Sequence, residues 1–308
     1  MAAVLCGAAG ATAARAGELP VLAGPAMGTT YEVTLAAEIP GLPRPAVHRE
    51  IERLIAEIDR AGSTWRPDAD AARVNAAAAG AWIPVSGHLV TILEVAREIH
   101  DRSGGAFDVT APGAAGNRPV GMRHVETRRS PPAVRTMVEG VAIDLGGIGP
   151  GYAVDVIGSR LAALGSAGHL VALGGEVRAW GTAGPGRPWR VRVTGVGPAG
   201  VAEDRVVDLA DGVALGTASV RPGRAPVDPR TGRPVGGPPR SLTARADSCA
   251  RADAWAVAAV VLALEPSTEG FVVAPAPAAE AVPNKASDAP RPPTTLEEEG
   301  AARAVEPA

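Results

Sequence analysis

The sequence predicts an α+β fold, in which strands and helices are mixed, and three observations lead to this prediction. Stretches with apolar residues at every second position lie among stretches whose apolar residues follow the helical period of 3.6. These elements do not form a regular strand–helix–strand repeat, which argues against a doubly wound parallel sheet. With 308 residues and 46% hydrophobic content, the chain can bury a substantial core.

The first predicted elements are a strand and a helix. Residues 30–35 predict a half-buried strand, because Tyr31, Val33 and Leu35 alternate with polar residues. Residues 47–62 predict a helix, because their apolar residues fall on one face and Gly62 ends the pattern.

Three further helices and several strands follow from the same periods. One helix begins after Ser86 and ends at Gly104-Gly105, one covers about 152–164, and the last covers about 251–264. Between the helices lie short apolar segments bounded by turn residues, which predict strands. These strands are expected at 141–145, 169–173, 177–180, 189–193, 213–216 and 241–244.

Composition divides the chain into three parts. Residues 1–20 form an Ala-rich segment that resembles a secretory signal or is disordered. Residues 21–272 hold the predicted elements and form one domain. Residues 273–308 are rich in Pro, Ala and Glu with few large apolar groups, which predicts a disordered tail. We expect the protein to be exported or attached to the cell envelope if the first segment is a signal, and cytoplasmic otherwise.

The charge distribution limits the expected partners. The formal charge is −3, and the tail carries six acids against Lys285, Arg291 and Arg303, so the predicted domain is neutral. No basic field indicates a nucleic-acid partner. The apolar run 253–264 is too short to span a bilayer, so any membrane proximity is expected to be peripheral.

The segment from Ile143 to Asp155 concentrates glycines between a predicted strand end and a helix start. Glycine lets a ligand approach the main chain closely, which favours a nucleotide cradle. The spacing of Gly147, Gly149 and Gly151 is not that of the dinucleotide fingerprint, and Pro150 removes an N–H that a phosphate would use. By itself the segment therefore predicts either a nucleotide-binding loop or a plain tight turn.

Six other short motifs, together with this segment, resemble the ApbE-like family of FAD:protein FMN transferases. The resemblance covers roughly residues 24–265, and it implies an FAD cleft between two lobes. It also implies transfer of the FMN half of FAD to a Thr or Ser hydroxyl of a partner protein, with Mg²⁺ and with AMP leaving. The six motifs are Met27-Gly28-Thr29-Thr30-Tyr31-Glu32-Val33, Ser63-Thr64-Trp65, Gly105-Ala106-Phe107-Asp108-Val109-Thr110, Leu173-Gly174-Gly175-Glu176, Asp228-Pro229-Arg230-Thr231-Gly232 and Ala252-Asp253-Ala254.

The resemblance implies a set of FAD-binding residues, each with a simpler alternative. Trp65 would stack on the isoalloxazine ring, or it would be a core residue. Asp108 would contact the nucleotide or be an ordinary turn residue, and Asp144 would accept hydrogen bonds from the cofactor or cap a turn or helix. The full expected set is Met27, Trp65, Ala106, Phe107, Asp108, Thr110, Asp144 and Pro150.

For Mg²⁺, which prefers oxygen ligands, the resemblance implies the backbone carbonyl of Gly147 and the carboxylate of Asp253. Without the resemblance, Asp253 would be an acidic residue near a helix N-terminus, favoured by the helix dipole. Val257 stands where the family has a threonine ligand, so we expect one oxygen fewer and weaker metal binding.

Further departures affect the expected chemistry. Ala225 stands where the family has a histidine, the natural proton acceptor near neutral pH. The family's Thr-Ser-Gly is Thr217-Ala218-Ser219 here, and Pro150 replaces a Lys or Glu. No catalytic residue is therefore assigned.

Three hypotheses follow for the function. The first is a Mg²⁺-dependent FAD:protein FMN transferase, and the second is a degenerate relative that binds FAD or another nucleotide and transfers nothing. The third is a structural domain with an empty cleft, which Trp65, Asp108 and Asp144 argue against.

Overall fold

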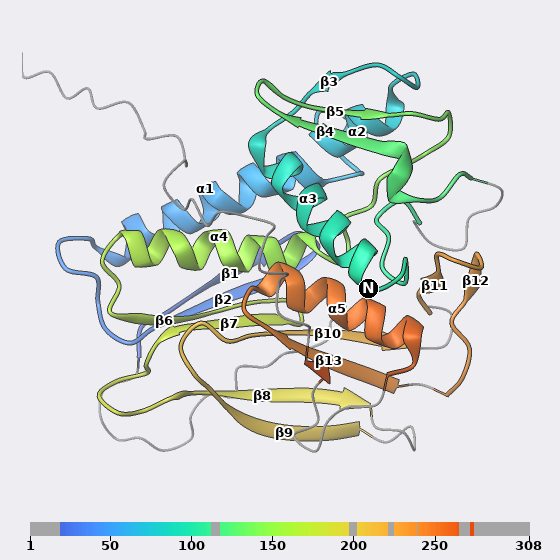
Figure 1. The fold of residues 1–308 in the computed structure, drawn as a ribbon. Helices are drawn as coiled ribbons and strands as arrows, with labels where there is room; N and C mark the ends of the chain where they lie inside the picture. The colour runs from blue at the N-terminus through green and yellow to red at the C-terminus, as the bar shows by residue number, and fades with distance from the viewer. Residues whose placement is uncertain are drawn as a thin grey trace, which may run out of the picture. The chain divides into compact units, whose positions relative to one another are not determined.

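The computed structural model describes residues 19–111, 118–196, 202–220, 225–238, 240–264 and 272–273. Its largest element is a seven-stranded sheet in the order β1-β2-β6-β7-β10-β13-β14 (Figure 1). Neighbouring strands are antiparallel except β13 and β14, which are parallel. The strands are β1 (Val21–Ala26), β2 (Thr29–Leu35), β6 (Gly168–Leu173), β7 (Glu176–Gly181), β10 (Ala214–Val220), β13 (Arg240–Ala246) and β14 (Val272–Val273).

Helices α1, α4 and α5 lie over one face of this sheet (Figure 1). Ser86 and Ser248 cap the N-termini of α3 and α5, each with a side-chain oxygen that accepts a backbone N–H. Pro150 lies in the first turn of α4, where a missing N–H costs no helical hydrogen bond. The helices are α1 (Arg44–Gly62), α2 (Asp70–Ala76), α3 (Gly87–Arg102), α4 (Gly149–Ala163) and α5 (Cys249–Leu262), with a 3₁₀ turn η1 at Met122–His124.

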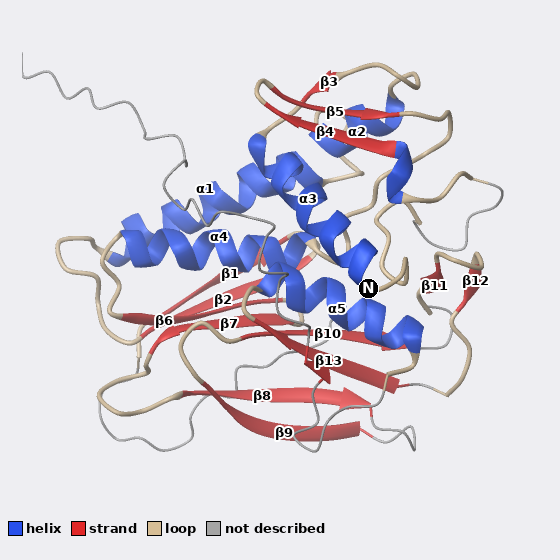
Figure 2. Cartoon of the chain, viewed as in Figure 1, coloured by secondary structure: helices blue, strands red, loops and turns tan. Residues whose placement is uncertain are grey.

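Three small sheets complete the described fold (Figure 2). A three-stranded sheet has the order β3-β5-β4, and two hairpins are formed by β8 with β9 and by β11 with β12. The β8–β9 hairpin packs through Trp189, Val191 and Leu209 on the face of the large sheet opposite the helices. The strands are β3 (Ile83–Pro84), β4 (Val125–Arg129), β5 (Pro132–Thr136), β8 (Trp189–Val196), β9 (Ala202–Leu209), β11 (Val227–Asp228) and β12 (Arg233–Pro234).

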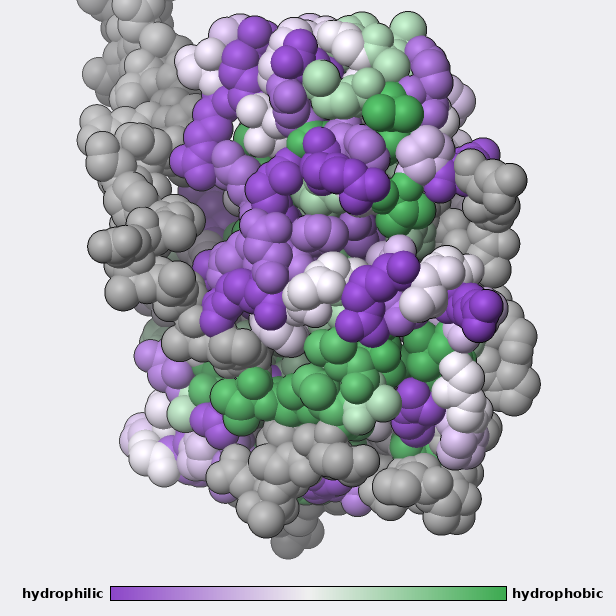
Figure 3. Space-filling model, turned by 45° about the vertical axis from the view of Figure 1, so that its right-hand side comes forward, coloured by the Kyte–Doolittle hydropathy of each residue, from purple (hydrophilic) through white to green (hydrophobic). Residues whose placement is uncertain are grey.

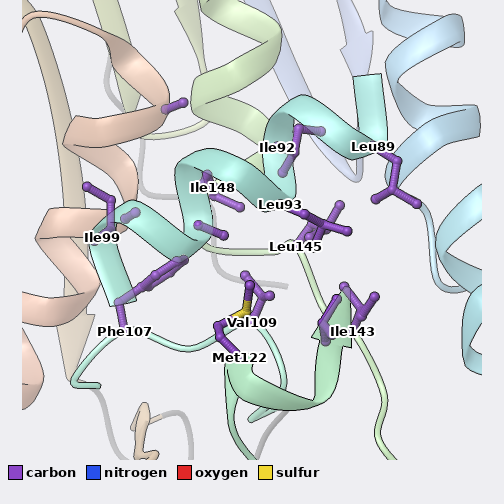
Figure 4. Packing of buried hydrophobic residues seen from close by; sticks show 14 of the residues in the cluster. Leu89, Ile92, Leu93, Ile99, Phe107, Val109, Met122, Ile143, Leu145 and Ile148 are labelled. Atoms are coloured by element: carbon purple, nitrogen blue, oxygen red, sulfur yellow. The ribbon is translucent and has the colours of Figure 1, made fainter. Parts of the chain in front are cut away.

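Two large hydrophobic clusters lie on the helical side of the large sheet. One joins α1 and α4 to β2 and β6. The other joins α3 and α5 to the three-stranded sheet β3-β5-β4. Figure 4 shows Leu89, Ile92, Leu93 and Ile99 of α3 facing residues of the segments 107–109 and 143–148. Tyr152 packs against both clusters, so the start of α4 lies at their boundary. The expected FAD cleft between two lobes stays a prediction.

The α+β prediction is confirmed, and each of the four predicted helices is present. The predicted strand at 141–145 is wrong, although Val141, Ile143 and Leu145 are buried as its alternation required. The amide side chain of Asn75 satisfies both backbone polar groups of Ile143. It accepts a hydrogen bond from the Ile143 N–H (2.7 Å) and donates one to the Ile143 carbonyl (2.9 Å). A side chain therefore takes the place of a neighbouring strand.

The ends of the chain lie mostly outside the described residues. The signal-like segment and the tail therefore stay predictions, although Val273, the first residue assigned to the tail, pairs with Arg245 of β13. Within the described ranges, no helix is both long and apolar enough to cross a membrane. The surface in Figure 3 is mixed, with a band of hydrophobic residues below a mostly hydrophilic region.

Candidate functional site

Contacts from two other parts of the chain hold the Gly-rich segment in place. Asn75 of α2 binds Ile143, and the Asp144 N–H donates to the Val109 carbonyl (2.8 Å). The Asp144 carboxylate accepts the Gly146 N–H (2.8 Å), which is the turn-capping role considered from the sequence. The Asp144 side chain is exposed, so contact with a cofactor stays a prediction.

Two glycines of the segment lie directly against α5. A Cβ atom on Gly147 would lie 3.1 Å from Val257 Cγ2 and 3.4 Å from Phe107 Cε2. A Cβ on Gly151 would collide with the Cys249 carbonyl and the Asp253 side chain. Protein atoms thus explain why glycine is needed at position 151 and leave little room for a side chain at position 147. The close approach brings the loop to the Asp253 carboxylate.

Asp253 and Glu176 form a pair of buried carboxyl groups beside this loop. Asp253 is 6% exposed and accepts the Gly151 N–H at 3.2 Å. Glu176, from the start of β7, is 7% exposed and accepts the Gly175 N–H at 3.0 Å. Burial raises the pKa of Glu176, and the nearby carboxylate of Asp253 raises it further; burial also raises the pKa of Asp253. Among the described residues, no arginine or histidine forms an ion pair with either group.

This donor set fits a hard divalent cation. Two buried carboxyl groups that lack a cationic partner ionise together only if a cation neutralises them. The Gly147 carbonyl and the Asp253 carboxylate are the residues that would hold Mg²⁺, which prefers such oxygen ligands. The described residues contain no group of three or more His, Cys, Asp or Glu side chains arranged for a metal, so water and phosphate would have to supply further ligands.

Met27 reaches the same loop from the turn between β1 and β2. Met27 and Gly28 both have positive φ (47° and 79°), the conformation of a two-residue hairpin turn. The turn places Met27 Cε 3.5 Å from the position that a Cβ on Gly149 would occupy. Met27 therefore covers the start of α4, where the resemblance places an apolar wall.

Trp65 follows the C-terminus of α1 and is 93% exposed, so it is not a core residue. Its backbone N–H bonds Ser63 Oγ (3.3 Å), and the following Arg66 pairs with Asp68. Gly62, three residues earlier, faces Leu145 of the Gly-rich segment. The ring is thus free to stack on a ligand, and this role stays a prediction.

The loop 106–110 is buried and organised by Asp108. Its carboxylate accepts bonds from the Thr110 N–H (2.8 Å), the Thr110 hydroxyl (2.6 Å) and the Met122 N–H (3.2 Å). Burial alone would raise the pKa of Asp108, but the bonds from His100 and Thr110 outweigh it and hold the pKa below its usual value. Ala106 and Phe107 are also buried. Direct contact of this loop with a nucleotide stays a prediction.

The structure brings His100 into this site, although it lies in none of the motifs that carry the family resemblance. His100 Nδ1 lies 3.1 Å from the Asp108 carboxylate and 3.1 Å from the Phe107 carbonyl. A Cβ on Gly105 would touch both His100 Cε1 (3.5 Å) and Arg230 Cγ (3.6 Å), so the Asp228–Gly232 motif packs on the same loop. In the sequence, His100 is followed by the Gly104-Gly105 turn and then by Asp108. This short separation was the one sequence feature that could have indicated a contact between the two side chains.

Two of the positions that depart from the family pattern, 218 and 225, hold alanine. Ala225 packs partly buried against the cluster that contains Val220 and Leu242. Ala218, next to the retained Thr217, is also a partly buried residue that packs against hydrophobic clusters. Neither position therefore supplies a proton acceptor of the kind that histidine provides.

The fold and this site match one family. The model of the ApbE family matches residues 27–271, and the chain belongs to the ApbE family. The chain is 28% identical to the FAD:protein FMN transferase of Vibrio cholerae over 83% of this chain and 84% of that protein. It is also 28% identical to the FAD:protein FMN transferase of Escherichia coli K12, over 82% of this chain and 81% of that protein.

Solved structures agree with this membership. The flavin transferase ApbE from Vibrio cholerae superposes with a TM-score of 0.70 at 26% identity, covering 80% of this chain and 87% of that chain. The apo form of the Pseudomonas stutzeri flavinyl transferase ApbE gives a TM-score of 0.71 at 27% identity, covering 79% and 84%.

Proposed function

We propose that this protein is an FAD:protein FMN transferase, which moves FMN from FAD to a Thr or Ser hydroxyl of an acceptor protein. The observation that carries the proposal is the approach of the Gly-rich loop to a buried carboxylate, with the Gly151 N–H bonded to Asp253. Met27 and Phe107 line the same loop. Membership of a family whose relatives carry this activity in their names supports it.

The chemistry is attack of a hydroxyl oxygen on the phosphorus of the FMN half of FAD. A bond forms between that oxygen and that phosphorus, the pyrophosphate bond to the adenosine half breaks, and AMP leaves. At the start of α4 the N–H groups of Gly149, Gly151 and Tyr152 already bond protein acceptors, so the helix would favour the phosphates through its dipole rather than through these donors. Pro150 reduces the number of these donors by one.

Mg²⁺, when bound at Gly147 and Asp253, would draw negative charge off the pyrophosphate and help AMP to leave. Val257 Cγ2 lies over Gly147, so a methyl group faces the place where a hydroxyl would add a ligand. The site as built therefore favours weak binding of the metal.

The acceptor is proposed to be an exported protein that carries a Thr or Ser flavinylation site and lies near a membrane surface. The signal-like character of residues 1–20 supports this placement.

The test is incubation with FAD, Mg²⁺ and Thr- or Ser-containing peptides fused to a carrier protein, each matched with its Ala version. Transfer predicts AMP release together with covalent flavin fluorescence on the Thr or Ser acceptor alone. Asp253→Asn serves as the site-directed control and should abolish both signals. Tight FAD binding with neither signal would favour the second hypothesis, a relative that binds flavin without transferring it.

A further inference from the structure

The site contains a histidine in a position suited to proton transfer. Five histidines are present in the chain, and all lie in described segments. His169 is fully buried and bonds through both ring nitrogens, to Ser166 and to the Gly158 carbonyl. Burial lowers its pKa to about 4, so it is a structural residue. Burial also lowers the pKa of His88, which bonds the Tyr152 hydroxyl.

His100 differs because a buried carboxylate orients its ring. Nδ1 lies 3.1 Å from the Asp108 carboxylate, whose side chain is 1% exposed, while the His100 side chain is 24% exposed. The orientation of the Asp108 carboxylate is fixed by further bonds from the Thr110 N–H and hydroxyl and from the Met122 N–H. With Nδ1 carrying the proton that faces the Phe107 carbonyl and the Asp108 carboxylate, the other nitrogen, Nε2, is the acceptor on the opposite side of the ring. This is the arrangement by which an acid–histidine pair prepares a general base.

Phe107 connects this pair to the Gly-rich loop of the proposed site. Phe107, whose carbonyl contacts Nδ1, reaches Gly147 of the Gly-rich loop with its ring. In Figure 4 the Phe107 ring lies below the end of α3, near Ile99, and points toward Ile148 of the Gly-rich segment. Gly105 lies against both the His100 ring and the Arg230 side chain. Arg230 follows Ala225 by five residues, so His100 lies close to the segment that contains position 225.

We propose that His100, oriented by Asp108, is the general base that replaces the histidine missing at position 225. This inference rests on the proposed transfer of FMN. His100 Nε2 takes the proton of the acceptor hydroxyl while the hydroxyl oxygen forms its bond to the FMN phosphorus. The bond from that phosphorus to the bridging oxygen breaks, and its electron pair leaves with AMP.

The charges around His100 suit this role. The bond to Asp108 raises the pKa of His100, burial opposes the rise, and Asp101 adds to it. Arg230 faces the same loop, but its guanidinium is forked onto Asp228. Because a base acts in its unprotonated form, the transfer rate should rise with pH through the pKa of His100, above the usual 6.5.

The test compares single-turnover transfer by the parent, His100→Gln and the control His124→Gln, which alters a histidine at the η1 turn away from the Phe107–Gly147 contact. His100→Gln should slow transfer on the order of 100-fold or more, keep FAD affinity within about two-fold and lose the rising limb of the pH profile. Asp108→Asn should move that limb to lower pH, a shift that loss of packing alone would not produce. Ala225→His in the His100→Gln background should restore a large part of the rate.

The unmodified protein provides a test that needs no variant. Histidine NMR of the parent should show His100 titrating with the pKa of the kinetic limb. Equal rates and pH profiles for parent and His100→Gln, or a His100 pKa away from the limb, would overturn the assignment of the base and leave the transferase proposal intact. A parent that binds FAD and releases no AMP would overturn both.

Discussion

Replacing Asp155 should separate α5 from α4 and weaken the metal site, although Asp155 itself lies outside the cleft loop. Its two carboxylate oxygens accept the N–H groups of Cys249 and Ala250, both at 2.9 Å, and Arg178 donates to it at 2.6 Å. These N–H groups belong to the first turn of α5, which has no intrahelical acceptors for them. Asp155, a residue of α4, thus caps the N-terminus of α5. The capped residues Cys249 and Ala250 lie one helical turn before Asp253.

The magnitude follows from what Asp155→Ala leaves behind. Two N–H groups lose their acceptor, and Arg178, whose side chain is 18% exposed, loses its partner. Breaking a buried pair by removal of one member costs about 3–5 kcal/mol, and each unpaired buried N–H costs about 1–3 kcal/mol before relaxation and water entry. We expect a loss of about 3–5 kcal/mol in the free energy of unfolding.

Urea unfolding measures this loss, with Asp247→Asn as the matched control. Asp247 pairs with Arg251 of the same helix at 3.3 Å, but it is 57% exposed, so its removal should cost less than about 0.5 kcal/mol. A loss below about 1 kcal/mol for Asp155→Ala would refute the capping argument. The expected loss of about 3–5 kcal/mol together with unchanged Mg²⁺ affinity of the folded variant would refute the link from Asp155 to Asp253.

Three other predictions concern the ligand sites and the helix pair α1–α4. Trp65→Ala should weaken FAD binding by about 1–3 kcal/mol in fluorescence titration. It should leave the melting temperature unchanged because the side chain is exposed; equal affinity would remove Trp65 from the site. Val257→Thr should tighten Mg²⁺ binding in calorimetric titrations with FAD, since it offers an oxygen next to Gly147; unchanged affinity would contradict a metal site there. Bonds from Arg53 lower the pKa of Glu50 to about 2 against burial, with help from Arg160 of α4. Its stabilisation is therefore fully present above pH 4.5 and lost as the pH falls through about 2, so Glu50→Gln should cost about 1 kcal/mol at pH 7 and only a small part of that at pH 2; a pH-independent cost would contradict this.

Local periodicity predicted the elements that bury one clear face. The helix from 44 to 62 follows from its apolar face, and β2 follows from the alternation around Tyr31 and Val33. β1 escaped prediction because Gly24 and Pro25 interrupt it, which an edge strand tolerates. The segment 141–145 was misassigned because alternation reports burial, whereas a strand also needs a partner, and here Asn75 supplies the bonds.

The same limit applies to the site. Motifs that are continuous in sequence, such as the Gly-rich run and the residues around Asp253, could be selected by resemblance. Asp155 bonds Cys249 and Ala250, which follow it by 94 and 95 residues in the sequence, and no local sequence pattern predicts contacts over that separation. His100 is only eight residues from Asp108, but its value depends on the turn between them and on the approach of Arg230, which the tertiary fold provides.

The charge balance around Cys249 argues that this site is kept for a function. The charges near the buried Cys249 thiol are the carboxyl groups of Asp155, Glu176 and Asp253 and the guanidinium of Arg178. Burial raises the pKa of the thiol, the three carboxylates raise it further, and Arg178 opposes the rise. Arg178 pairs with Asp155, which leaves two buried carboxyl groups without a cation among the described residues. Apolar side chains of similar volume would be cheaper to bury than such a pair. A domain with an empty cleft gains nothing from this cost, whereas a site that receives a divalent cation and a pyrophosphate needs the negative charge already in place before they arrive.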